Sequence, residues 1–157
     1  MPTVKSCFIE RGGLWVLGQF ALLAVALLGG FFWSSQWENT ATWALGWVFM
    51  LVAAVFGVYG VRALGRNLTP FPKPLDHAHL VTEGIYGWVR HPLYTAVICW
   101  VIGWGLVRES GPAMLCAGLL LVVLDRKARH EEVHLGRIFP GYQDYAGRVK
   151  RIIPWVY

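Results

Sequence analysis

Two groups of ionisable residues lie at the ends of apolar stretches of this chain. Arg90, His91 and Tyr94 stand at the start of one stretch, and Glu131 and Glu132 follow the end of the next. These side chains can bind polar ligands through charge and hydrogen bonds, but they are costly to place beside a membrane core. Such placement usually marks the path of a ligand or substrate, so we expect a site at the cytosolic ends of two helices.

The composition indicates an integral membrane protein. The chain has 157 residues, 56% of them hydrophobic, and its mean hydropathy of +0.48 is too high for an ordinary soluble domain of this size. Residues 13–33 and 39–61 carry no charge. Each stretch is long enough to cross a hydrocarbon core of about 30 Å at about 1.5 Å per residue.

The predicted fold is an all-α, polytopic membrane protein whose single domain covers 1–157. About four transmembrane helices are expected near 13–33, 42–64, 92–107 and 110–125, the last two as a tight hairpin. The connection 65–91 is a candidate cofactor loop, because a loop of that length without a helix is usually functional. The fourth helix should continue to Pro140, and a short amphipathic helix should follow, so 126–157 forms a cytosolic helical extension.

The basic residues predict the orientation. Every lysine and arginine except Arg108 would lie on one side of the membrane, which places both termini in the cytosol. The membrane would be the inner membrane in a bacterium or the endoplasmic reticulum in a eukaryote. The net charge of +5 then reflects topology and attraction to anionic membrane lipids, and we expect no nucleic-acid partner and no obligate protein partner.

A longer motif contains the two ionisable groups. It runs Leu80-Val81-Thr82-x-Gly84-x-Tyr86-x-x-x-Arg90-His91-Pro92-x-Tyr94, continues through the apolar hairpin to Glu131-Glu132-x-x-Leu135 and Phe139, and ends with two tyrosines and Ile153-Pro154. From about Asn67 to its end, the chain resembles the isoprenylcysteine carboxyl methyltransferase and phospholipid methyltransferase superfamily. The resemblance implies a membrane methyltransferase that uses S-adenosylmethionine and has no Rossmann domain.

The resemblance also implies roles for individual residues. Arg90 and Glu132 are the expected catalytic residues, with Glu132 or a water as the base if the acceptor is a thiol or a protonated amine. The cofactor-binding residues would be His79, Leu80, Val81, Tyr86, His91, Pro92, Leu93, Tyr94 and Glu131. The isoprenylcysteine enzymes have an arginine four residues before the glutamate, where this chain has Lys127, so Lys127 and Arg126 are candidates for substrate binding.

The methyl acceptor is expected to be lipid-soluble or an apolar small molecule that passes between the third and fourth helices. A lipid amine, an apolar thiol and a prenylated carboxylate all fit. Lysine presents a point charge rather than the fork of arginine, which disfavours a carboxylate at Lys127. A simpler interpretation of Lys127 and Glu131 is an i,i+4 salt bridge on a solvated helix end.

Other functions overlap the same residues. His130-Glu131-x-x-His134 fits the zinc-peptidase pattern, in which two histidines bind zinc and a glutamate activates water. A third ligand is missing from the obvious places, so we expect no metal. Sterol reductases share the hairpin and a similar chain ending, which leaves a nicotinamide-dependent reductase as a second alternative. A membrane scaffold without activity would not need Arg90, His91 and Tyr94 together with Glu131.

Overall fold

The computed structural model describes residues 12–35, 39–73, 75 and 78–157. These residues form five α-helices and two short 3-10 helices: α2 Gly13–Phe32, α3 Thr40–Leu64, η1 Gly65–Asn67, η2 Gly84–Gly87, α4 Pro92–Val107, α5 Gly111–Ile138 and α6 Tyr142–Arg148. Within the described ranges the only β pairing is one isolated bridge between Val89 and Lys150. The all-α prediction is confirmed. Part of the predicted cofactor loop, including Pro74, lies outside the described residues.

Local sequence explains where the helices begin. Asn39 caps α3 by accepting a hydrogen bond from the amide of Ala41 at 2.9 Å, and Ser110 caps α5 through Ala113. Pro92 opens α4 at a position where its missing amide hydrogen costs nothing. α5 covers 28 residues because its apolar first half continues into a charged second half without a helix breaker.

Two helices, α2 and α3 with the η1 turn, are long and apolar enough to cross a membrane, and α4 is a shorter apolar helix. Their outward faces carry large apolar side chains, such as Phe20 at 56% and Leu51 at 66% exposure. Exposure of such surfaces to water is unfavourable, whereas contact with lipid chains is not. These helices associate the protein with a membrane.

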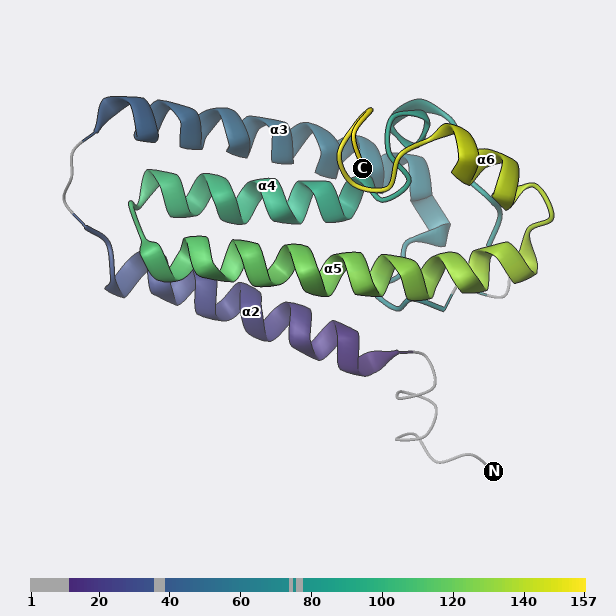
Figure 1. The fold of residues 1–157 in the computed structure, drawn as a ribbon, viewed down its shortest axis with the longest axis horizontal. Coiled ribbons are helices and arrows are strands. Elements are labelled where there is room, and N and C mark those ends of the chain that lie inside the picture. Colours follow the sequence, from purple (N-terminus) through teal and green to yellow (C-terminus); the bar gives the residue numbers. More distant parts are fainter. Residues whose placement is uncertain (1–11, 36–38, 74, 76–77) are drawn as a thin grey trace.

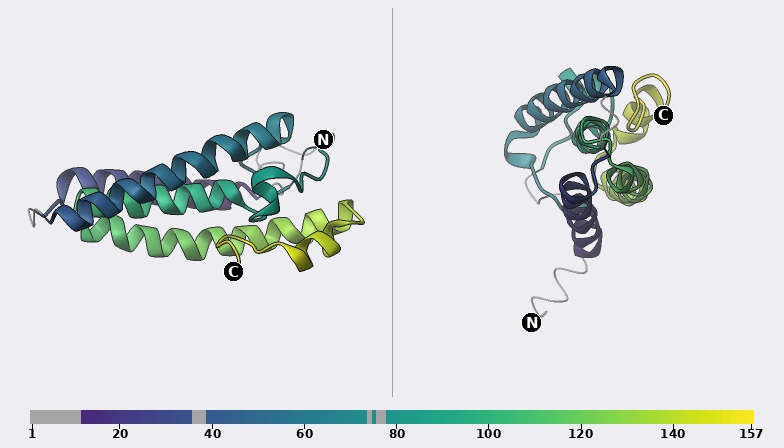
Figure 2. Two further views of the ribbon diagram at one scale, coloured as in Figure 1. Left: turned by 90° about the horizontal axis from the view of Figure 1, so that it is seen from above. Right: turned by 90° about the vertical axis from the view of Figure 1, so that its left-hand side faces the viewer.

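The four long helices alternate in direction along the bundle (Figures 1 and 2). The start of α2, the end of α3, the start of α4 and the charged half of α5 therefore lie at one end. The connection from α3 to α4 and helix α6 lie at this same end (Figure 1). We call it the polar end, because it collects His91, Glu131 and Glu132.

Close packing fixes α4 against both neighbours. A Cβ atom added at Gly103 of α4 would lie 2.7 Å from the carbonyl oxygen of Gly46 in α3, so the backbones meet where both residues are glycine. On its other side α4 packs on α5 through a fully buried cluster that includes Val101, Leu120 and Leu124. α4 is thus held in a fixed position, which a precise site at its start requires.

Candidate active site

A cavity lies at the polar end, between the connection 65–91 and helices α4, α5 and α6. Nine predicted site residues line it: His79, Leu80, Val81, Tyr86, Arg90, His91, Leu93, Tyr94 and Glu131. Four others do not: Pro92 is buried in the first turn of α4, while Arg126, Lys127 and Glu132 point elsewhere from α5. The structure therefore brings together residues that are up to 52 positions apart in sequence, from His79 to Glu131.

Tyr94 links the cavity residues of α4 to α5. Its hydroxyl donates a hydrogen bond to Oε2 of Glu131 at 2.8 Å. Its ring stacks on the His91 imidazole, with centroids 5.0 Å apart and planes 8° apart. The His91 Nδ1 lies 3.7 Å from the same Glu131 oxygen. The Oε1 atom of Glu131 has no partner among the described residues, so this carboxylate can still bind a polar ligand.

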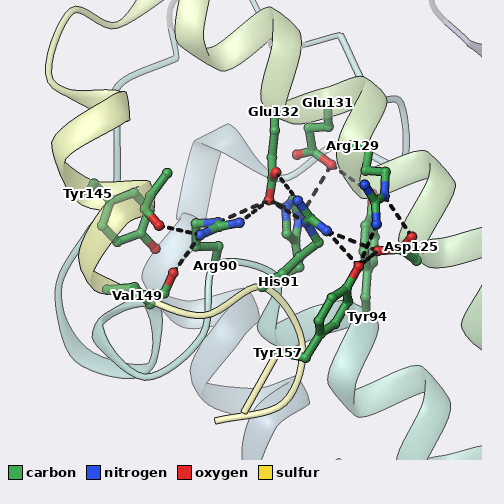
Figure 3. Close-up of polar contacts among 12 residues, drawn as sticks. Arg90, His91, Tyr94, Asp125, Arg129, Glu131, Glu132, Tyr145, Val149 and Tyr157 are labelled. Atoms are coloured by element: carbon green, nitrogen blue, oxygen red, sulfur yellow. Dashed lines mark hydrogen bonds and ion pairs between the residues drawn. The ribbon is translucent and has the colours of Figure 1, made fainter. Parts of the chain in front are cut away.

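Glu132 is the centre of an ion-pair cluster beside the cavity (Figure 3). Its Oε1 accepts from Nε of Arg90 at 3.0 Å and from Nε of Arg151 at 3.0 Å, and it lies 3.2 Å from Nε2 of His91. Nη2 of Arg151 donates to Oε2 at 2.9 Å. Burial alone would raise the pKa of Glu132, but the hydrogen bonds from His91 and Arg151 and the charge of Arg90 hold it well below its ordinary value.

This environment bears on the role expected for Glu132. A carboxylate that binds protons so weakly is a poor general base near neutral pH. Its contacts instead fix the ring of His91 and the guanidinium of Arg90. Arg90 also donates to the carbonyl oxygens of Ala146 at 2.7 Å and Val149 at 2.5 Å. The geometry favours Glu132 and Arg90 as residues that position the cavity wall.

The segment after α6 supports the cavity residues Arg90 and His91 through backbone hydrogen bonds, which sequence reasoning missed. The amide of Arg90 donates to the carbonyl of Lys150 at 2.8 Å, and the amide of His91 donates to that of Arg151 at 3.0 Å. The Thr95 hydroxyl donates to the carbonyl of Ile152 at 2.7 Å. This pairing holds the entry to α4 against the chain end, and no local pattern in the sequence shows it.

A second set of contacts anchors Arg151. Its Nη1 lies 3.1 Å from Oδ1 of Asp125, and the Tyr157 hydroxyl donates to the same oxygen at 2.9 Å. Nε of Arg129 also donates to Oδ2 of Asp125 at 2.8 Å. The sequence contains a pattern that could have indicated this cluster. Asp125 precedes Glu132 by seven residues, so the two carboxylates lie two turns apart on one face of the helix.

Lys127 was considered either as a substrate contact near the lipid headgroups or as part of a salt bridge on a solvated helix end, and its burial makes the solvated interpretation wrong. The residue is 1% exposed. Its ammonium donates to Oε1 of Gln19 in α2 at 2.7 Å and lies 5.2 Å from the centre of the Tyr94 ring. Burial is the main cause that lowers the pKa of Lys127, and the charge of Glu131 opposes it. Arg126, by contrast, is exposed.

A groove between α2 and α3 offers an apolar surface next to the cavity. It has a volume of about 870 Å³ and is lined by side chains that include Phe20, Leu23, Met50 and Val97. Leu93 and Tyr94 line the cavity, while Ala96 and Val97, one turn further along α4, line the groove. The acceptor route expected between α4 and α5 is filled by the buried core cluster.

The zinc-peptidase pattern does not assemble a metal site in the described part of the chain. No group of three or more potential ligand residues is present there. Nδ1 of His134 lies 2.9 Å from the carbonyl oxygen of His130 in its own helix, and Glu131 is engaged by Tyr94. The histidines of the motif thus make local helix contacts rather than the convergent arrangement that zinc requires.

Comparison with known proteins places the chain in a family. It is 28% identical to the nickel-cobalt-cadmium resistance protein NccN of Alcaligenes xylosoxydans xylosoxydans, over 98% of this chain and 70% of that protein. It is 27% identical to the cobalt-zinc-cadmium resistance protein CzcN of Cupriavidus metallidurans, over 92% of this chain and 64% of that protein.

A third relative is the protein-S-isoprenylcysteine O-methyltransferase of Schizosaccharomyces pombe, which is 32% identical over 68% of this chain and 54% of that enzyme. The chain thus spans only about half to two thirds of the length of these relatives. The model of the phospholipid methyltransferase family matches residues 41–141, which is more than half of the chain. The protein therefore belongs to the phospholipid methyltransferase family of enzymes.

Proposed function

We propose that this protein transfers a methyl group from S-adenosylmethionine to an apolar acceptor at the cytosolic face of a membrane. The observation that carries the proposal is the cavity at the polar end. Its wall combines the Tyr94–Glu131 hydrogen bond with the His91 ring, and it lies directly beside an apolar groove. A polar donor from water and an apolar acceptor from lipid can meet there.

The residues of the cavity fit such a donor. Glu131 offers an uncommitted carboxylate oxygen, suited to the ammonium or the ribose hydroxyls of the cofactor. Asn67 Oδ1 and the Tyr142 hydroxyl are buried without a hydrogen-bond partner among the described residues, and both residues line the cavity. Buried polar atoms rarely stay unpaired. A ligand with hydrogen-bonding groups would satisfy them.

The cavity is small for this ligand. Its volume of about 110 Å³ is below the range of roughly 300–1,000 Å³ usual for ligand pockets. The connection 65–91 forms the wall opposite α5, and it is the part without a long helix. We therefore expect the segment 78–83 to move outward when the cofactor binds. Hydrogen exchange of its amides should change on addition of S-adenosylhomocysteine.

S-Adenosylmethionine would supply an electrophilic methyl group that is transferred by in-line displacement. The residues of this chain would align the two reactants and exclude water, and no nucleophilic side chain is required. His91, Tyr94 and Glu131 would hold the donor, with Arg90 and Glu132 fixing His91. If the acceptor is a thiol or an amine, its proton must go to a group other than the ion-paired Glu132.

The acceptor is proposed to enter through the groove between α2 and α3 rather than between α4 and α5. The groove is almost entirely apolar, and its α4 lining residues Ala96 and Val97 lie one turn beyond Leu93, which lines the cavity. A hydrocarbon chain bound there would gain about 25 cal/mol per Å² of buried apolar surface. One relative is named for a prenylated cysteine substrate, which is consistent with an apolar acceptor for this chain.

The proposed topology has four crossings with both termini in the cytosol. α4 has 16 residues, about 24 Å at 1.5 Å per residue, so it crosses only a thin or locally thinned core. Arg108, the single basic residue at the end opposite the polar end in the described chain, supports this orientation. In cells, a membrane-impermeant maleimide should label Ser34→Cys and spare Lys73→Cys.

Cofactor binding tests the proposal directly. Calorimetry of the purified protein in detergent should detect S-adenosylhomocysteine binding, and neither zinc nor NADPH should bind. Glu131→Gln should weaken S-adenosylhomocysteine binding about ten- to hundredfold, because a hydrogen bond to a charged group is worth about 1.5–3 kcal/mol. Asp144→Asn, which changes an exposed carboxylate that does not line the cavity, is the matched control. Equal affinity in both variants would contradict the assignment of Glu131.

A further inference from the structure

Asn67 is a cavity residue to which neither the motif nor the family match gives a role. It follows α3 in the η1 turn and is 7% exposed. Its Nδ2 donates to the carbonyl oxygen of His79 at 2.9 Å and lies 3.3 Å from Nδ1 of the same residue. The residue lines the cavity, and its Oδ1 is buried and has no hydrogen-bond partner within the described chain.

The contacts with His79 determine which way the amide faces. Oxygen and nitrogen of an asparagine amide are assigned from their hydrogen-bond partners. A reversed amide would place Oδ1 against the backbone carbonyl of His79, two acceptors facing each other, and the Nδ2 hydrogen bond would be lost. The backbone carbonyl cannot change its role, so Oδ1 is the atom left without a partner.

An unpaired buried carbonyl is costly. The penalty is about 1–3 kcal/mol for each such group, and native proteins keep few of them without a reason. The atom is an acceptor without charge, so it suits a neutral N–H donor. A cationic donor such as an ammonium is better matched by the carboxylate of Glu131, which lies in the same cavity.

The surroundings of Asn67 favour a heterocycle as that donor. Beside the polar Thr69 and His79, the lining from its own connection includes Phe71, Ala78, Leu80 and Val81, together with Leu64 at the end of α3. These side chains present aromatic and aliphatic surface, on which a flat base can pack. The charged lining residues, Arg90 and Glu131, come instead from the start of α4 and from α5.

We propose that Oδ1 of Asn67 accepts a hydrogen bond from the exocyclic amine of the adenine ring and so selects an adenosyl ligand over an inosyl ligand. The inference rests on the proposed function, because it requires an adenosyl cofactor in this cavity. The inosyl analogue carries a carbonyl oxygen in place of the amine. Two acceptors would then face each other, and Oδ1 would stay unpaired.

The test compares S-adenosylhomocysteine with S-inosylhomocysteine by calorimetry on the full-length protein in detergent. The wild-type protein should bind the adenosyl ligand about tenfold or more tightly than the inosyl ligand, the cost of one unpaired buried group. In Asn67→Ala the ratio should fall to within about threefold of one. Asn39→Ala is the matched control, since Asn39 caps the far end of α3 and should leave the ratio unchanged.

The outcomes distinguish a failure of the role of Asn67 from a failure of the proposed cofactor. Equal binding of both ligands by the wild-type protein overturns the role of Asn67 while leaving the cofactor in place, and this holds even if Asn67→Ala does not fold. Loss of both affinities in Asn67→Ala with the ratio retained also overturns it, because Asn67 would then only support the loop. Binding of neither ligand by the wild-type protein overturns the proposed cofactor itself.

Discussion

The ion-pair cluster around Glu132 should dominate the stability of the polar end. Glu132→Gln keeps the shape of the side chain but removes the charge that Arg90 and Arg151 share. The three side chains are only 10–16% exposed, so the two guanidiniums would lose their main counter-charge in a largely buried place. Breaking a buried ion pair from one side costs about 3–5 kcal/mol. Asp125 still neutralises part of Arg151, so we expect about 3 kcal/mol.

Thermal unfolding in detergent measures this loss. For a chain of this size each kcal/mol lowers Tm by about 2–4 °C, so Glu132→Gln should unfold about 6–12 °C below the wild-type protein. The exposed Glu83→Gln should unfold within about 2 °C of it. Replacing both Glu132 and Arg151 with methionine should cost less than the two single changes added together, since both members of that ion pair are then removed and only Arg90 still loses its counter-charge.

The stability that the Glu132 cluster contributes should depend on pH in the acid range. The pKa of Glu132 is lower in the folded protein than in the unfolded chain, so the stability it contributes is full above its ordinary pKa of about 4.3. That contribution is lost as the pH falls from there toward the depressed pKa. The advantage of the wild-type protein over Glu132→Gln should therefore begin to fall below about pH 4 and should continue to fall at lower pH. A Tm difference that is small at pH 7, or unchanged at pH 3, would refute this account of the cluster.

Three further predictions concern other parts of the chain. Gln19→Leu should destabilise the protein by about 1.5–3 kcal/mol in thermal unfolding, because it leaves the Lys127 ammonium without its acceptor, and Gln19→Glu should restore most of that loss. Gly103→Ala should cost about 1–3 kcal/mol in the same assay, because the new methyl group meets backbone atoms of Gly46 and Met50 as well as the Met50 side chain, and the backbone atoms cannot move aside as a flexible side chain can. Chelators and His134→Ala should leave methyl transfer unchanged; stoichiometric zinc lost with that variant would support the peptidase alternative.

The sequence predicts the helices well because their signals are local. Uncharged apolar runs, Asn39 and Ser110 as caps and Pro92 at a helix start each act within a few residues. The gathering of the motif at one end follows as well, since consecutive helices joined by short connections must alternate in direction. This reasoning needs no knowledge of how the helices pack against one another.

Side-chain roles at the polar end depend on partners far away in the chain, and the sequence leaves those open. Glu131 and Glu132 are neighbours on a helix and point about 100° apart, so only one of them can face the cavity. Which one does so is decided by Arg151, which arrives 19 residues later. Likewise Gln19 is a polar residue in an apolar helix, but its partner Lys127 lies 108 positions away.

The burial of Lys127 bears on which chemical groups of the acceptor the proposed site can bind. An ammonium that already donates to Gln19 and lies over Tyr94 is 1% exposed, so an acceptor carboxylate would reach it only by displacing the Gln19 oxygen. The ammonium contacts the ring of Tyr94, and the same ring stacks on the imidazole of His91. Lys127 therefore fits better as a support behind the donor cavity than as a contact for the acceptor. Under the proposed function, selection of the acceptor then falls to the apolar groove, whose lining suits a hydrocarbon by shape and not by charge.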